Sequence, residues 1–185
     1  MKKYLSILTA SSLLAASLNA KADFYIGYEV SSMSADTAAN ENKQGLDETI
    51  QGLGFGMRLY TDVNPDLDIG GEFGFSHLET RSEISGNIVH GQFILKYHLS
   101  PNVELLGGLG VALRGTPTES NTTVESDATL TSGLGSIGIA YVTDNEWRFD
   151  ITYHYFSFSG NIEDADETIS TNLFGFHVGK SFEVK

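Results

Sequence analysis

The sequence contains no cysteine, which excludes disulfide bonds, thiol catalysis and cysteine-ligated zinc. Proline is scarce too, with 3 residues against 20 glycines, a balance that suits a sheet protein better than a helical bundle. Basic residues are few: 11 Lys and Arg stand against 24 Asp and Glu, so the formal charge is −13. Nucleic acid is therefore not an expected partner, because binding phosphates requires a positive surface. The 185 residues correspond to about one domain.

The first 22 residues have the features of a secretory signal peptide. Positive charges at Lys2 and Lys3 precede an apolar, Ser- and Ala-rich stretch over residues 4–18, and Ala20-Lys21-Ala22 supplies the small-x-small cleavage pattern. The stretch is short and interrupted by polar residues, which disfavours the alternative of a membrane anchor. We predict that residues 1–22 are removed and that residues 23–185 form the mature domain. Loss of three lysines takes the formal charge from −13 to −16.

No later stretch approaches the ~20 consecutive apolar residues of a spanning helix. Instead, apolar residues alternate with glycine or polar residues, the period of a β-strand. The alternation occurs in eight segments, near residues 24–31, 52–59, 67–76, 89–99, 104–114, 130–142, 147–155 and 174–184.

The sixth segment does not keep one phase. Leu130 and Leu134 share one parity, whereas Ile137, Ile139 and Tyr141 share the other. A β-bulge near Gly135 or Ser136 would reconcile the two phases.

The connections between the segments alternate in length. Short turns are expected near residues 62–66, 100–102 and 143–146, and longer polar loops near 35–47, 79–85, 115–127 and 160–168. This alternation is typical of outer-membrane barrels, which have short periplasmic turns and longer extracellular loops. The sequence thus predicts an all-β protein: a closed, eight-stranded, antiparallel transmembrane β-barrel with up-and-down topology.

The polar face of the segments indicates a membrane barrel and not a soluble one. It carries many glycines, such as Gly52, Gly54 and Gly56, together with histidines and charges of both signs. A narrow eight-stranded barrel has room inside for small residues, whereas water-facing strand positions favour larger polar side chains. We therefore expect the apolar face to contact lipid.

Charges on the inward face are expected to pair, because an unpaired buried charge is costly. Folding the hairpin about Asn64 brings Arg58 near Asp68 and Glu72, and folding the next about Pro101 brings Lys96 near Glu104. We predict an internal, structural ion-pair network in the periplasmic half, composed of Glu29, Arg58, Asp68, Glu72, Lys96, Glu104, Arg148 and Asp150. Independent solvated surface charges are the alternative.

Aromatic residues are expected to form two belts at the membrane interfaces. The belt near the short turns would comprise Phe24, Tyr60, Tyr97, Trp147 and Phe182, and the belt near the loops Phe75, Phe156, Phe158 and Phe174. Lys180 interrupts the apolar face and is expected to extend to the interface. Lipid does not tolerate unpaired backbone groups, so the first strand must pair with the eighth.

These patterns resemble the small outer-membrane β-barrel proteins of the OmpA/OmpX-like type. The resemblance is carried by the signal peptide, the opening Phe24-Tyr25-Ile26-Gly27, the glycine alternation over 52–56 and the segment Trp147–Tyr155. The end of the chain is similar to the signal that the barrel-assembly machinery recognises, with His177, Gly179, Phe182 and Val184 at the matching positions. The final Lys185 departs from the aromatic residue common in the family. The resemblance implies the outer membrane of a Gram-negative cell.

Catalysis and metal binding find little support. A lipid A-modifying hydrolase would need a histidine and a serine on one face, with a carboxylate to orient the histidine. The only candidate is His154 with Ser157 or Ser159, followed by Glu163 or Glu167, but His154 and Ser157 are an odd interval apart and would point to opposite faces. The histidines are spread over several segments and do not converge at one depth, so no metal site, cofactor or catalytic residue is predicted. A narrow porin-like ion channel remains an alternative.

The remaining candidate for function is the set of long loops, which carry most of the negative charge. The run Glu163-Asp164-Ala165-Asp166-Glu167 lacks an EF-hand pattern and favours a solvated acidic loop. Weak binding of Ca²⁺, or bridging to anionic lipopolysaccharide through divalent ions, is the alternative. We expect a non-enzymatic, monomeric outer-membrane protein that displays acidic loops for adhesion or for an envelope role. Its expected partners are outer-membrane lipid, lipopolysaccharide, the barrel-assembly machinery and an extracellular ligand that the sequence does not identify.

Overall fold

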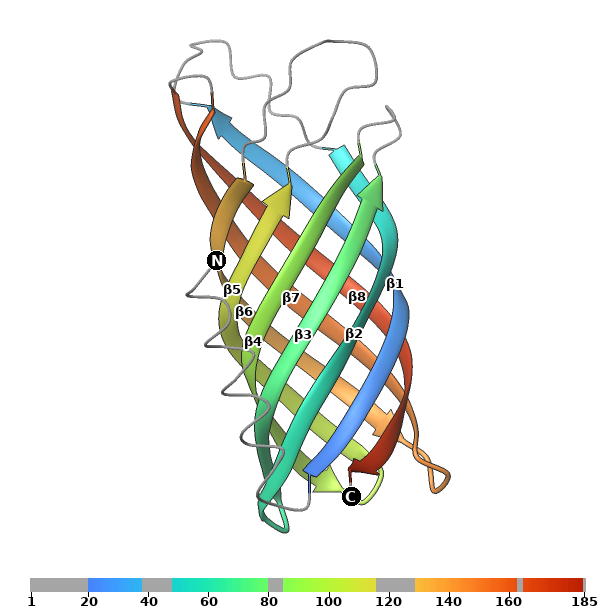
Figure 1. The fold of residues 1–185 in the computed structure, drawn as a ribbon. Helices are drawn as coiled ribbons and strands as arrows, with labels where there is room; N and C mark the ends of the chain where they lie inside the picture. Colours follow the sequence, from blue (N-terminus) through green and yellow to red (C-terminus); the bar gives the residue numbers. More distant parts are fainter. Residues whose placement is uncertain (1–19, 38–47, 80–84, 116–128, 163–164, 185) are drawn as a thin grey trace.

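The computed structural model describes residues 20–37, 48–79, 85–115, 129–162 and 165–184 (Figure 1). The strands are β1 (Ala20–Thr37), β2 (Glu48–Asn64), β3 (Leu67–Glu79), β4 (Ser85–Ser100), β5 (Val103–Gly115), β6 (Thr129–Val142), β7 (Trp147–Ile162) and β8 (Ala165–Val184). Each pairs antiparallel with the next, and β1 pairs with β8, so the sheet is a closed barrel and the predicted fold is confirmed. None of the described residues belongs to a helix long and apolar enough to cross a membrane.

Both ends of the barrel wall meet at the side of the short turns. Ala20 at the start of β1 pairs with Val184 near the end of β8, and Figure 1 shows the C-terminus beside the tight connections. Most of the predicted signal peptide, residues 1–19, lies outside the described residues, whereas residues 20–22 form the first part of β1. The loop predicted over residues 160–168 is shorter than expected, because β7 and β8 continue their ladder as far as Ile162 and Ala165.

Side chains alternate between the two faces of the sheet as predicted, with the apolar face outside. Phe55, Phe93 and Ile151 are each about half exposed, at 54%, 52% and 47%, whereas the Arg58 side chain is only 1% exposed. Phe24, Tyr97, Trp147, Phe174 and Phe182 also lie on the outer surface. A barrel with an apolar exterior and a charged interior is the arrangement that a lipid environment favours.

Two of the predicted aromatic-belt positions are wrong. Tyr60 is buried, and its hydroxyl donates a hydrogen bond to Asp23 at 2.7 Å inside the barrel. Phe156 is fully buried as well. Each residue follows the parity of its strand, Tyr60 that of Arg58 and Phe156 that of His154, so the regular alternation overrides the preference of the aromatic side chain. The Phe158 side chain lies outside the described residues.

The predicted β-bulge in the sixth segment is also wrong. Strand β6 keeps an uninterrupted register with β5 and with β7. Leu134 therefore points into the barrel, where it is buried, while Ile137 and Ile139 point outward. The change of phase in the sequence reflects an apolar residue on the inner face and not an extra residue in the strand.

Candidate functional site

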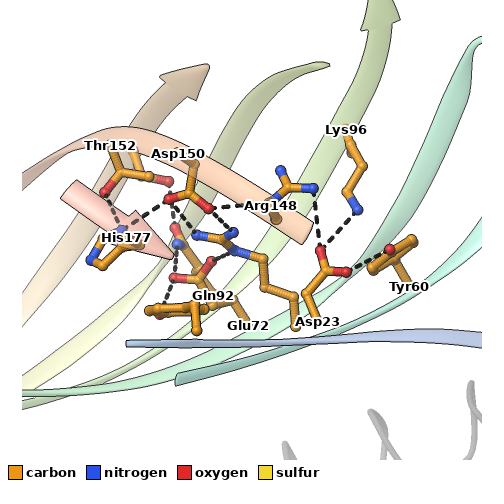
Figure 2. A network of polar contacts seen from close by, with 12 residues as sticks. Asp23, Tyr60, Glu72, Gln92, Lys96, Arg148, Asp150, Thr152 and His177 are labelled. Carbon is orange, nitrogen blue, oxygen red and sulfur yellow. Dashed lines mark hydrogen bonds and ion pairs between the residues drawn. The ribbon is translucent and has the colours of Figure 1, made fainter. Parts of the chain in front are cut away.

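Inside the barrel, at the end nearest the short turns, lies a cluster of charges centred on Asp23. Asp23 is not part of the network predicted from the sequence. The Asp23 carboxylate lies 3.1 Å from Lys96 Nζ and 3.4 Å from Arg148 Nη1, and it accepts hydrogen bonds from Tyr60 Oη and from Ser181 Oγ. Figure 2 shows Asp23 between Lys96, Arg148 and Tyr60. The ammonium of Lys96 also lies 3.1 Å from the centre of the Tyr60 ring, which places a cation over an aromatic face.

Arg148 joins this cluster to a second one deeper in the barrel. Its Nη1 pairs with Glu104, and its Nε lies 3.2 Å from Asp150 Oδ2. Lys96 Nζ is 3.7 Å from the same Glu104 carboxylate. The structure thus brings Lys96 to Glu104, as hairpin geometry predicts, and adds a link to β7.

The second cluster is centred on Arg58, which extends from β2. Its Nε lies 2.5 Å from Glu72 Oε2, and its Nη1 lies 2.7 Å from Asp150 Oδ2. The guanidinium carbon lies 4.4 Å above the centre of the Tyr25 ring. Arg58 therefore links β2, β3 and β7, and it stacks on a side chain of β1.

Glu72 accepts hydrogen bonds from several strands at once. Besides Arg58, its carboxylate contacts Tyr25 Oη at 3.2 Å, His90 Nε2 at 3.0 Å and Gln92 Nε2 at 2.9 Å. A buried carboxylate with this many donors is stabilised in its charged form by hydrogen bonding. Glu72 is the point at which β1, β2, β3 and β4 are tied together.

Two histidines each bridge a pair of carboxylates. His177 Nδ1 lies 2.9 Å from Asp150, and its Nε2 lies 3.2 Å from Glu29. His98 contacts Asp68 at 3.0 Å and Glu104 at 3.4 Å. At His177 both ring nitrogens are within hydrogen-bond distance of a carboxylate, an arrangement that suits an imidazolium with its two donors. His177 thereby connects β8 to both of its neighbours, β7 and β1.

Glycines on the inner face make room for these long side chains. A Cβ atom at Gly54 would meet the Glu29 carboxylate, and one at Gly74 would meet the His90 ring. A Cβ at Gly175 would meet the His177 ring. The alternating glycines thus leave the space that the polar network occupies, because a larger residue at these positions would displace the network side chains.

Beyond the polar network, towards the long connections, the interior becomes apolar. This apolar layer consists of Leu78, Ile88, Ala112, Leu134, Phe156 and Leu173. The Phe156 side chain is 0% exposed. The layer was not predicted, because the inner face of a membrane barrel was expected to be polar throughout.

All eight residues of the predicted network are buried in the barrel. The structure adds Asp23, Tyr25, Tyr60, Gln92 and the bridging histidines, all of which share the inward parity of their strands. That parity was the available signal for these residues. Of the predicted assembly-signal positions, His177 lies inside, Gly179 packs against the Phe24 backbone, and Phe182 and Val184 point outward.

The catalytic alternative loses its candidate geometry. His154 is buried in the barrel beside His90 and Phe156, with its ring 5.1 Å and 5.9 Å from theirs, and it does not face the outer leaflet. The Ser157 backbone nitrogen donates to Ser132 Oγ, and the Glu163 and Glu167 side chains lie outside the description. Across the described ranges, no group of three or more potential ligands is arranged to hold a metal ion.

Several solved structures with the same fold are those of outer-membrane proteins. Ail, the attachment invasion locus protein of Yersinia pestis, superposes with a TM-score of 0.56 at 18% identity and covers 89% of this chain and 100% of its own. Neisserial surface protein A superposes with a TM-score of 0.56 at 13% identity, and the match covers 86% of this chain and 97% of its own. OprG from Pseudomonas aeruginosa superposes with a TM-score of 0.50 at 11% identity, and the match covers 90% of this chain and 98% of its own.

A comparison with curated proteins gave no match. The family model for the outer membrane protein beta-barrel domain matches residues 5–182, nearly the whole sequence. This chain therefore belongs to the outer membrane protein β-barrel domain family, and its location is the cell outer membrane.

Proposed function

We propose that this protein is a non-enzymatic barrel that presents acidic extracellular loops for interactions at the cell surface. The observation that carries the proposal is the filled interior. The Arg58 and Arg148 side chains are 1% and 0% exposed within the ion-pair network, and the apolar layer lies beyond them. An interior occupied by charged and apolar layers in series favours a scaffold over an open diffusion pore.

The charge of the long connections points to the kind of ligand. The segment 163–167 contains four acidic residues in five positions, and the loops together carry most of the negative charge of the mature chain. Ail has been solved with the heparin analogue sucrose octasulfate, a polyanion. The acidic loops of this chain would repel such a ligand, so we propose a cationic surface, or lipopolysaccharide bridged by divalent cations, as the interacting class.

The buried position of His154 supports a non-enzymatic role. A lipid A-modifying site would have to present its histidine to the outer leaflet, and here the ring lies among lumen residues. We propose that the barrel acts as a monomer that contacts outer-membrane lipid on its apolar exterior.

A cell-retention assay tests the proposed function. The loop variant carries Glu163→Gln, Asp164→Asn, Asp166→Asn and Glu167→Gln, and the matched control carries Asp66→Asn and Asp144→Asn at the short turns. Cells displaying the parent or the control should be retained on a polylysine-coated surface, and cells displaying the loop variant several-fold less. Equal retention of all three at equal surface levels would overturn the proposal.

A further inference from the structure

We propose that Lys180 of β8 and Trp147 of β7 form a binding site for the headgroup of an anionic phospholipid on the outer wall of the barrel. The two residues pair directly across the β7–β8 ladder, and Lys180 Nζ lies 5.5 Å from the centre of the Trp147 ring. A cation within about 6 Å of an aromatic ring is attracted to its face. The site lies on the lipid-facing wall, so it does not depend on the function proposed for the loops.

Lys180 differs from the other basic residues that the structure describes. Four of these lie buried inside the barrel, namely Arg58, Lys96, Arg114 and Arg148. Lys21 pairs with Asp62 at 2.8 Å. Lys180 instead has the outward parity of Val178, and no carboxylate of the described residues pairs with it. A charge on an apolar, lipid-facing wall is costly by itself, so its ammonium group requires an anion from outside the protein.

The position of the pair along the barrel corresponds to the level of phospholipid headgroups. Trp147 is the first residue of β7, and Lys180 lies four residues before Val184, the last residue of β8. Both are therefore at the short-turn end, which faces the periplasm in outer-membrane barrels. Lys and Trp side chains at such a position extend their polar ends to the interface. The indole N–H of Trp147 has no hydrogen-bond partner among the described residues, so it and the ammonium group can both donate to phosphate oxygens.

An apolar surface for the acyl chains continues from the pair along the same wall. Phe24 of β1 lies on the other side of Lys180 in the same row of the sheet. The next two rows towards the long connections carry apolar and aromatic side chains across β7, β8 and β1, namely Phe149, Val178 and Ile26, then Ile151, Phe176 and Tyr28. Each of these six side chains is between 41% and 60% exposed. A cation at headgroup level beside an apolar wall is complementary to the two parts of a phospholipid.

The charge of the site favours an anionic headgroup over a zwitterionic one. A zwitterionic headgroup carries its own cation next to the phosphate, and that cation weakens the attraction to the Lys180 ammonium group. An anionic headgroup keeps its net charge and pairs with the ammonium group directly. From the attraction of one basic residue to anionic lipid, we expect the site to bind phosphatidylglycerol about fivefold more tightly than phosphatidylcholine.

The fluorescence of Trp147 tests the proposal, because this residue is the only tryptophan in the sequence and reports on the site alone. The folded protein is placed in vesicles of phosphatidylcholine and phosphatidylglycerol in equal amounts, with bromine, a fluorescence quencher, on the acyl chains of one lipid or of the other. Brominated phosphatidylglycerol should quench Trp147 more strongly, with a relative binding constant about fivefold that of phosphatidylcholine. Equal quenching by the two lipids would overturn the proposal.

Three variants assign the preference to Lys180. Lys180→Gln should abolish it, and Lys180→Arg should keep it. The matched control combines Lys180→Gln with Leu99→Lys, which restores the net charge but places the cation on β4, on the opposite side of the barrel from β8. Leu99 is 54% exposed at the short-turn end, so a lysine is tolerated there. The control should show no preference at Trp147, whereas a preference that persists in Lys180→Gln, or returns in the control, would contradict the site.

Discussion

Arg58 and Asp150 are 92 residues apart in the sequence, yet their side chains pair at 2.7 Å in the interior of the barrel. The contact joins β2 to β7, strands that share no ladder. It exists only when the sheet is closed, so the charge pairing and the closure of the barrel stabilise one another.

Removing Arg58 should therefore destabilise the whole barrel. Arg58→Met leaves Glu72 and Asp150 buried without their shared cation, and the expected loss is about 3–5 kcal/mol in the free energy of unfolding. Urea unfolding in detergent, followed by the gel mobility of unboiled samples, measures this loss. Arg58→Lys, which keeps the positive charge, should lower the free energy of unfolding by less than Arg58→Met does. A loss under ~1 kcal/mol for Arg58→Met would show that the network contributes little.

The glycines of the two faces should respond in opposite ways to alanine. At Gly54 a methyl group would meet the Glu29 carboxylate, so Gly54→Ala should cost about 1–3 kcal/mol of folding free energy. At Gly107 an added Cβ has open space within 4 Å, so Gly107→Ala should change the stability by at most ~0.5 kcal/mol or raise it slightly. Equal losses at both positions would contradict the assignment of the two faces.

His177 should make the stability of the barrel depend on pH. The groups facing its ring are Glu29 and Tyr25 from β1, Asp150 and Thr152 from β7, and Arg58 from β2. The imidazolium donates to both carboxylates, and loss of its proton as the pH rises removes one of these hydrogen bonds, so stability should fall with rising pH.

The pH effect is isolated by subtraction. His177→Gln cannot gain or lose the proton, so its stability should fall less than that of the parent as the pH rises above about 6.5, the ordinary imidazole pKa. His77→Gln is a suitable control, because His77 is exposed near the opposite end of the barrel. A parent and a His177→Gln variant with parallel pH profiles would contradict the bridging role.

The filled interior predicts that the folded protein is electrically silent. In planar lipid bilayers we expect no steady conductance from the parent, because the ion-pair network and the apolar layer occupy the lumen in series. A steady, ohmic current from correctly folded protein would instead favour the channel alternative.

Interactions between neighbouring strands can be predicted from the sequence. Two-residue periodicity fixed the faces, and hairpin geometry placed Arg58 beside Glu72 and Lys96 beside Glu104. It could not place Arg58 beside Asp150, because that contact depends on how the closed sheet brings non-adjacent strands together. His177, by contrast, bridges its own two neighbouring strands, since Asp150 pairs with it across the β7–β8 ladder and Glu29 lies on β1.

Apolar residues on the inner face account for the other differences. When a membrane barrel is predicted from alternation, apolar side chains are placed on the lipid-facing side. For this reason Leu134 suggested a bulge, and Phe156 suggested a position at the membrane interface. Both lie inside because they belong to the apolar layer that crosses the lumen on the side of the long connections. Alternation reports which residues share a face, and composition alone does not reveal a change from a polar to an apolar interior along that face.

The central claim is that apolar side chains contact lipid while charges fill the interior. Spin labels attached at residues 55, 93 and 151 of the protein in lipid vesicles test it most directly, by comparing collisions with oxygen, which concentrates in lipid, and with a water-soluble nickel chelate. The account predicts high oxygen and low nickel accessibility at all three positions, and low accessibility to both at the inward-facing residue 152. Labels at 55, 93 and 151 that are shielded from both reagents, or that collide mainly with nickel, would contradict it.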